Sequence, residues 1–242
     1  MKKLLLFTLA FLSFFFAEAQ ETYHDSTALA ILDKMSQTIG ELKSLKFKTH
    51  TSQDVAFSND YLIKDFKSGE YIFQGPDRLL AKVSHNGKDQ FYLYDGKQMV
   101  YYSLADNTYA AADAPASTLE MLDQISDEFG IELVVADFLY PDFTANLMEN
   151  MDYIEFLGKT EVQGEKYFHI GGANDTMTFQ IWVSQDLIMR PKRVVITYMG
   201  DPYARQLEVT FEDWQINQSY PESIFEFMPP PNSRQIIWTK KD

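Results

Sequence analysis

The side chains most able to do chemistry are carboxylates in the middle of the chain: Asp123, Asp127, Glu128, Glu132 and Asp137. Paired carboxylates can serve as general acid and general base, as they do in glycoside hydrolysis. The solvated outer face of an amphipathic helix accounts for the same spacing, and we weigh that interpretation more heavily. The carboxylates therefore direct attention to this segment without establishing a reaction.

The remaining chemistry-bearing residues form no recognisable site. His24, His50, His85 and His169 are scattered along the chain, with no pair at the spacing of one helix face. The absence of cysteine excludes disulfides, thiol catalysis, zinc-thiolate sites and lipid attachment after signal cleavage. The sequence also lacks a nucleophile elbow, a Walker loop, a dinucleotide-binding motif, a zincin motif and an EF-hand loop. We therefore expect a protein that is not an enzyme and that uses no cofactor or metal.

The carboxylates lie in a helical insertion at about residues 115–150. Ser117 followed by Glu120 is a capping box, and Gly130 supplies a left-handed stop. The residues between them recur at the spacing of one helix face: Leu119, Leu122, Ile125 and Phe129. A second apolar run ends at Tyr140, and Pro141 suits the first turn of a third piece. This pattern predicts two or three short apolar helical pieces.

On either side of the insertion, the pattern is that of β-hairpins. Asn86-Gly87 and Asp95-Gly96 are favoured hairpin turns, because these residues tolerate a positive φ. An amphipathic helix is predicted from Asp25 or Ser26 to about Lys43. About ten strands and two helical segments indicate a mainly β (α+β) fold with one large twisted antiparallel sheet, and the helices are the available cover for one face.

The N-terminus reads as a secretory signal peptide. Lys2 and Lys3 precede an apolar run at residues 4–16, and Ala17-Glu18-Ala19 has the form of a cleavage site. We expect cleavage after Ala19, one domain at residues 20–242, and no transmembrane segment in the mature chain. The formal net charge of −14 argues against a nucleic acid or an anionic membrane surface as partner.

Aromatic residues make up 15% of the chain, and several occupy alternate positions in the predicted strands. Most of them must form the core beneath the sheet. A curled sheet covered by an apolar lid can also enclose a hydrophobic ligand. The residues alone leave both a solid core and a ligand cavity open.

Several segments, in order along the chain, resemble one known family. They are Gly75-Pro76-Asp77-Arg78-Leu79, Tyr94-Asp95-Gly96-Lys97, Ala114-Pro115-Ala116-Ser117-Thr118-Leu119, Phe129-Gly130-Ile131-Glu132-Leu133, Pro191-Lys192-Arg193-Val194 and Phe225-Glu226-Phe227-Met228-Pro229-Pro230. The family is that of predicted periplasmic proteins catalogued as domain of unknown function 2092, which looks like a member of the LolA/LolB-like superfamily. The resemblance implies an incomplete antiparallel barrel around a hydrophobic cavity, a helical lid and a periplasmic location. In the characterised members, the cavity holds lipoprotein acyl chains.

One position departs from the superfamily pattern. The lipoprotein carrier has a basic residue just before the proline of the strand-start motif, and this residue latches the lid through hydrogen bonds to lid backbone. The present chain has Gln74-Gly75 there. Either Arg78 replaces the missing base as the latch, or the lid is held in another way.

Together, these observations predict an exported binding protein that holds a lipid or lipoprotein acyl chain between a concave sheet and a helical lid. A regulatory module of the same fold, acting in the sensing of envelope stress through a protein partner, is the alternative. We expect a monomer. The ligand-binding side chains predicted for the lid are Leu119, Leu122, Ile125, Phe129, Leu133, Phe138, Leu139 and Phe143, and those predicted for the sheet are Phe47, Phe91, Leu93, Met99 and Tyr101. A register error of one residue would reverse the face assigned to each sheet residue.

Overall fold

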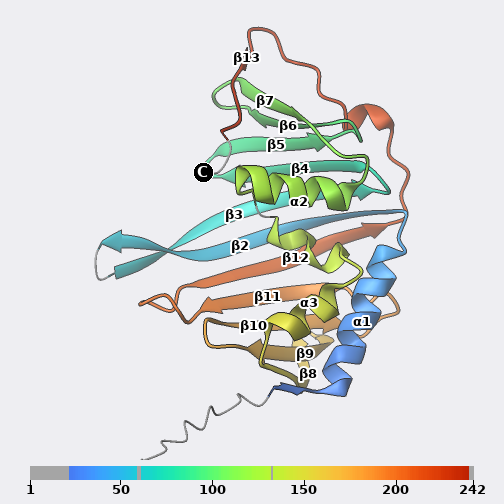
Figure 1. Ribbon diagram of the computed structural model, residues 1–242, viewed down its shortest axis with the longest axis vertical. Helices are drawn as coiled ribbons and strands as arrows, with labels where there is room; N and C mark the ends of the chain where they lie inside the picture. The colour runs from blue at the N-terminus through green and yellow to red at the C-terminus, as the bar shows by residue number, and fades with distance from the viewer. Residues whose placement is uncertain (1–21, 59–60, 132, 240–242) are drawn as a thin grey trace, which may run out of the picture.

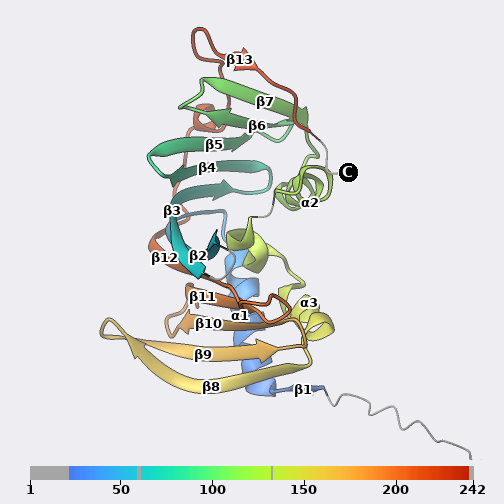
Figure 2. The same ribbon diagram turned by 90° about the vertical axis from the view of Figure 1, so that its left-hand side faces the viewer.

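The computed structural model describes residues 22–58, 61–131 and 133–239. Its strands form one continuous sheet, in the order β1-β8-β9-β10-β11-β12-β2-β3-β4-β5-β6-β7-β13. Neighbouring strands are antiparallel except at the two edges, where short strands pair in parallel. The sheet is open and curled, and the α-helices lie on its concave side (Figures 1 and 2). The expected large antiparallel sheet with helical cover is confirmed. The predicted signal peptide lies outside the described residues.

One part of the sheet is built from the first half of the chain, with the short β13 (Arg234–Gln235) at its edge. Its other strands are β2 (Ser44–Ser58), β3 (Tyr61–Gln74), β4 (Arg78–His85), β5 (Lys88–Tyr94), β6 (Gln98–Ser103) and β7 (Thr108–Asp113). The other part is built from the second half of the chain, with the short β1 (Tyr23–His24) at its edge. Its other strands are β8 (Tyr153–Val162), β9 (Glu165–Ala173), β10 (Met177–Ser184), β11 (Pro191–Tyr198) and β12 (Gln206–Ile216). The long β2 and β12 join the two parts, because they pair with each other along most of their length.

Turn chemistry sets several of the connections. Asn86 and Gly87 join β4 to β5 with φ angles of 51° and 74°, as the two-residue hairpin requires. Gly96 takes a φ of 85° in the turn between β5 and β6. The sequence pattern assigned no strand to β7. It predicted a last strand from Ser233 to Trp238, whereas β13 contains only Arg234 and Gln235.

The helical cover consists of α1 (Ser26–Gly40), α2 (Thr118–Phe129), the 3-10 helix η1 (Val134–Leu139) and α3 (Phe143–Asn150), and a short 3-10 helix η2 (Glu222–Ile224) lies near the C-terminus. The Asp25 carboxylate caps α1 by accepting the N–H groups of Thr27 and Ala28. Gly130 ends α2 in the left-handed conformation. No helix in the described residues is long and apolar enough to cross a membrane.

The capping box of α2 is formed in part as expected. The Ser117 hydroxyl oxygen accepts the N–H of Glu120, which is the predicted half of the motif. The Glu120 carboxylate does not complete the box in the usual way, since it accepts the Ser117 hydroxyl instead. The local signal therefore places the start of α2 correctly.

The core lies between the concave face and the helices, and its centre is aromatic. The Phe47 side chain is fully buried, and its ring centroid lies between 4.7 and 6.2 Å from the rings of five other residues. These residues are Tyr71, Phe73, Phe138, Phe211 and Trp214. Strands β2, β3 and β12 are thus joined to the lid by one aromatic cluster.

A second apolar layer lies on the convex face of β5, β6 and β7, where the C-terminal segment crosses it (Figure 2). The Phe227 ring lies 5.5 Å from Tyr102 and 5.1 Å from Tyr109, measured between centroids. Leu93 and Val100 are buried in this part of the sheet. These strands are therefore covered on both faces.

Candidate functional site

The lid is α2, η1 and α3, and its inner side is packed directly against the sheet. The Phe138 ring of η1 lies 6.0 Å from Phe47 and 5.5 Å from Phe211, again between centroids. Met121 and Ile125 of α2 are at most 1% exposed. At these positions side chains, rather than a cavity, fill the space between lid and sheet. Apolar burial of this kind stabilises the docked lid.

Two hydrogen bonds hold the start of the lid. The backbone N–H of Thr118 donates to the carbonyl oxygen of Pro76 over 2.9 Å. The Tyr94 hydroxyl donates to the carbonyl oxygen of Pro115. Burial raises the pKa of Tyr94 to about 12, and the nearby charge of Asp77 acts in the same direction. The phenol therefore stays protonated and able to donate throughout the neutral range.

Arg78 does not form the lid latch that the sequence allowed. Its guanidinium donates to the carbonyl oxygen of Asp77 over 3.0 Å and pairs with the Asp77 carboxylate at 2.8 Å. Both groups lie against the turn at Gly96, where an added Cβ would stand within 2.6 Å of them. The residue therefore braces the turn between β5 and β6. The contacts of Tyr94 and Thr118 hold the lid instead.

The C-terminal segment gives the lid a further contact. Strand β13 pairs with β7, and the chain then continues to Trp238, whose ring lies 4.8 Å from the Phe129 ring between centroids. Phe129 lies in the last turn of α2. The sequence pattern gave no sign of this contact, because the two rings are more than one hundred residues apart.

A pocket of about 460 Å³ lies within the helical layer, between α2, η1 and α3. Its volume is within the range of roughly 300 to 1,000 Å³ that is usual for small-molecule sites. Three of the predicted lid residues line it, namely Leu122, Leu133 and Phe143. Ile131, Ala136 and Leu147 complete its apolar wall. The pocket exists because the chain breaks at Gly130 and again after Tyr140, so that the three helical pieces surround a common space.

The rim of this pocket is polar and carries negative charge. Asp123, Ser126, Asp137, Asn146 and Asn150 contribute to it. The Tyr140 hydroxyl donates to the Asp123 carboxylate over 2.8 Å. Burial raises the pKa of Tyr140, and the hydrogen bond to Asp123 and the charges of the neighbouring carboxylates raise it further. The apolar wall could take a hydrocarbon chain, and the rim could bind a polar head group.

The other predicted lid residues do not line this pocket. Ile125 and Phe138 are buried in the core beneath the lid. Leu119, Phe129 and Leu139 are half-buried and pack against that core. Only part of the predicted lid set is therefore brought together around one space. The polar rim residues Ser126, Asn146 and Asn150 were missed, because no spacing rule marks residues that meet only after the chain reverses.

On the sheet, the predicted set divides between the two faces. Phe47 and Met99 are buried on the concave face, and Tyr101 lies beside Tyr92 on the same face, with 5.4 Å between ring centroids. The assignment of Phe91 and Leu93 to that face is wrong. They pair with Tyr102 and Val100 in the β5–β6 ladder and share the convex face with them.

The physical reason for this error is that β5 is apolar on both faces. Residues 91–94 read Phe-Tyr-Leu-Tyr, so alternation cannot distinguish the two sides. The segment that covers the convex face arrives from residues 225–227, far away in the sequence.

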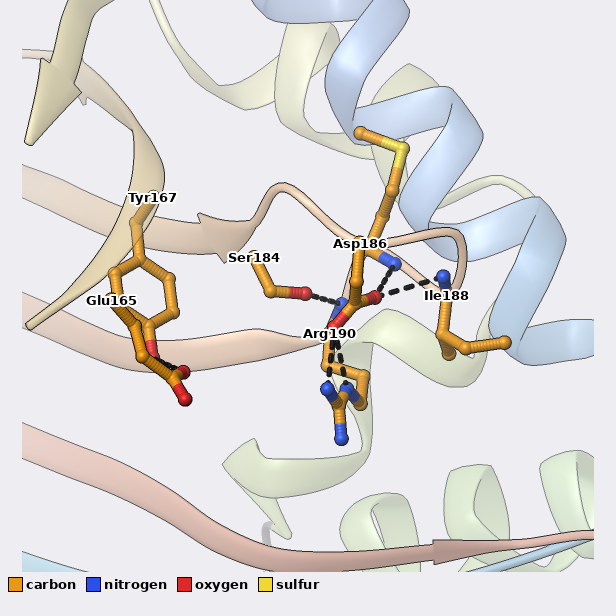
Figure 3. Close-up of polar contacts among 7 residues, drawn as sticks. Glu165, Tyr167, Ser184, Asp186, Ile188 and Arg190 are labelled. Carbon is orange, nitrogen blue, oxygen red and sulfur yellow. Dashed lines mark hydrogen bonds and ion pairs between the residues drawn. The ribbon is translucent and has the colours of Figure 1, made fainter.

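A separate group of polar contacts lies at the turn between β10 and β11 (Figure 3). The Asp186 carboxylate accepts the backbone N–H of Ile188 over 2.9 Å and pairs with the Arg190 guanidinium. The Ser184 hydroxyl oxygen accepts the backbone N–H of Arg190 over 2.8 Å. Burial acts to raise the pKa of Asp186, but the hydrogen bonds from Arg190 and the backbone outweigh it and lower the pKa. These contacts fix the turn.

Beside this turn, the Tyr167 hydroxyl donates to the Glu165 carboxylate over 2.9 Å (Figure 3). Burial raises the pKa of Tyr167 to about 12, and the hydrogen bond to Glu165 adds to the rise. Among the described residues, no group of three or more His, Asp or Glu side chains could hold a metal ion.

Comparisons with known proteins identify the family of this chain. The model of the family described as "Predicted periplasmic protein (DUF2092)" matches residues 28–238. A search of curated proteins gave no significant match.

The first two of the solved structures below share the fold at low identity. An uncharacterized conserved protein from Thermus thermophilus has a TM-score of 0.50 and 9% identity, with 87% of this chain and 99% of that chain covered. The lipoprotein LppX of Mycobacterium tuberculosis has a TM-score of 0.51 and 13% identity, with 82% and 99% covered. A LolA superfamily protein from Nitrosomonas europaea aligns at a TM-score of 0.37 and 11% identity, with 83% and 97% covered. The family expected from the residues is confirmed, and the chain belongs to the predicted periplasmic proteins of domain of unknown function 2092.

Proposed function

We propose that this protein is an exported, periplasmic binding protein without catalytic activity, cleaved after Ala19, that holds the apolar chain of a lipid or acylated lipoprotein. The observation that carries the proposal is the pocket between α2, η1 and α3, with its apolar wall and polar rim. This location differs from the one expected from the sequence. We propose that the apolar chain of the ligand lies among the lid helices and not between lid and sheet, because Phe138 occupies the space between the lid and Phe47.

The expected strength of binding can be bounded. Burying about ten methylene groups contributes roughly 8 kcal/mol, at roughly 0.8 kcal/mol for each. Association costs about 4 to 15 kcal/mol in lost freedom of motion. A single chain is therefore held weakly by its apolar contacts, and contacts at the rim must supply the rest. The polar residues around Asp123 are in the right place to do so.

Displacement of the neutral dye N-phenyl-1-naphthylamine by lipids tests the proposal. Phe143→Ser and Leu133→Ser change the wall of the pocket, and we expect each to weaken binding about tenfold. Phe129→Ser is the matched control, because Phe129 is a half-buried lid residue that contacts Trp238 instead of lining the pocket. Circular dichroism checks that each variant is folded. Equal binding by all three variants would refute this location.

Mass spectrometry of the protein isolated in its native state from its own envelope would identify a cargo. Co-purified acylated material at a fixed stoichiometry supports the proposal. A clean apo mass that lipids and lipopeptides leave unchanged contradicts it.

One observation favours the alternative of a regulatory module with a protein partner. The hairpin of β2 and β3 projects from the sheet (Figure 1) and exposes Phe57, Tyr61, Ile63 and Phe66, with between 48% and 70% of each residue in contact with solvent. Exposed apolar patches mark interaction sites in many soluble proteins. If this alternative holds, Phe57→Ser with Phe66→Ser abolishes cross-linking to one stoichiometric envelope protein, whereas Phe143→Ser does not.

A further inference from the structure

The lid segment is acidic throughout and contains no basic residue. Residues 115–150 contain eight Asp and Glu residues and no Lys, Arg or His, in a chain whose formal net charge is −14. The stretch without a basic residue is longer still, since it runs from Lys97 to Lys159. More than half of the net charge thus comes from one short segment, the segment that forms the pocket.

Part of this charge lies at the pocket itself. Asp123 and Asp137 line it, and no basic side chain is among the residues that do. The Asp123 carboxylate accepts the Tyr140 hydroxyl at the rim, with Oδ1 as the acceptor. Burial first, and then Asp123, Asp137 and Asp142 through their charges, raise the pKa of Tyr140. An added negative charge at this rim is therefore disfavoured.

The negative charges at the rim also act on any molecule bound in the pocket. A carboxylate or phosphate head group at the rim would meet the like charge of Asp123, and no basic residue lines the pocket to bind it, whereas an ammonium group would meet a charged acceptor. Hydrogen bonds between charged groups are stronger than neutral ones. An apolar wall beside a carboxylate thus favours a molecule that has a hydrocarbon chain and a positive charge next to it.

We propose that the pocket between α2, η1 and α3 selects a cationic amphiphile, whose chain contacts Leu122, Leu133 and Phe143 and whose positive group binds Asp123. This inference rests on the proposed function, since it assigns a ligand class to the same pocket. It goes further because it excludes fatty acids and anionic lipid head groups as the preferred cargo.

Three probes with the same chain test the charge preference by isothermal titration calorimetry at neutral pH, below their micellar concentrations: dodecylammonium, dodecanol and dodecanoate. We expect the cation to bind about tenfold more tightly than the alcohol, at the lower end of what one charged contact contributes. Dodecanoate should bind more weakly than the alcohol. Added salt should reduce the difference in affinity between the cation and the alcohol, because salt screens charges at an exposed rim. The affinity for the alcohol itself should stay the same.

Two matched variants locate the effect. Asp123→Asn keeps the shape of the side chain and an acceptor for Tyr140. We expect this variant to bind the cation no more tightly than it binds dodecanol. Asp127→Asn removes the same charge one turn later on α2, from an exposed residue outside the pocket lining, and should leave the tighter binding of the cation in place.

Each outcome has a separate meaning. Binding of the alcohol with no preference for the cation refutes the charge inference and leaves the proposed function standing. A preference that Asp127→Asn abolishes and Asp123→Asn does not refutes the role of Asp123. If none of the three probes binds, the pocket is not a chain-binding site and the proposed function fails as well.

Discussion

The two sides of the lid are built from the same segment but differ in almost every physical property. On the inner side, Met121, Ile125 and Phe138 are at most 3% exposed, and the Phe138 ring packs against the aromatic cluster around Phe47. On the outer side, apolar residues line an open pocket whose rim carries Asp123 and Asp137. The inner side can do little except stabilise the fold. The difference teaches that an apolar residue in a lid is not, for that reason alone, a ligand contact.

Phe138→Ala gives the largest effect that this comparison predicts. The substitution removes a buried ring from the contact with Phe47 and Phe211, and such changes cost about 3 to 5 kcal/mol. We expect a loss of this size in the free energy of unfolding, measured by urea denaturation. Phe143→Ala is the matched control on the pocket side, where the side chain is half-buried, and it should cost about 1 kcal/mol.

For dye binding, we expect the larger loss in Phe143→Ala and the smaller loss in Phe138→Ala. At a temperature where both variants are folded, Phe143→Ala should lose dye binding, whereas Phe138→Ala should keep much of it. Equal losses of stability in the two variants would show that the inner and outer sides of the lid do not differ as the structure indicates.

Tyr94→Phe tests how the start of the lid is held. The change leaves the Pro115 carbonyl oxygen without its donor, and a lost hydrogen bond of this kind costs about 1 kcal/mol. We expect the free energy of unfolding to fall by about 1 kcal/mol near pH 8. Hydrogen exchange of the Thr118 amide, which donates to Pro76, should become faster if the lid loosens.

The pH dependence of this variant follows from the pKa of Tyr94, which burial raises to about 12. An unfolded tyrosine titrates near 10. The folded state therefore holds the proton more tightly, so this contribution to stability is complete below about pH 10 and is lost as the pH rises towards 12. Tyr94→Phe should lose less stability than the native protein over that interval. An identical decline in both proteins would rule out Tyr94 as a contributor.

Local chemistry made much of the fold predictable. Asn86-Gly87 sets a hairpin, Ser117 starts α2 and Gly130 ends it, and each of these acts through a few neighbouring residues. Strand β7 escaped prediction because its central residues are alanines, which favour strands little on their own, and its place depends on pairing with β6.

The site was less predictable, because it depends on contacts between distant parts of the chain. Leu122, Leu133 and Phe143 line the pocket, whereas Ile125 and Phe138, with the same apolar character and similar spacing, point into the core. A period of 3.6 residues identifies an apolar face and says nothing of what that face meets. Where a helix has one apolar neighbour below and another beside it, only the three-dimensional arrangement separates the two roles.

Arg78→Ala should have the smallest effect, because its contacts belong to neither side of the lid. Its ion pair with Asp77 is partly exposed, and pairs of this kind contribute roughly 0 to 1 kcal/mol. We expect the free energy of unfolding to fall by less than about 1 kcal/mol, with hydrogen exchange of the Thr118 amide unchanged. Faster exchange at Thr118 would instead make Arg78 a latch after all, acting through the turn at Gly96. In that case the lid would depend on a charge at its edge, and the division between an inner side that anchors and an outer side that binds would be incomplete.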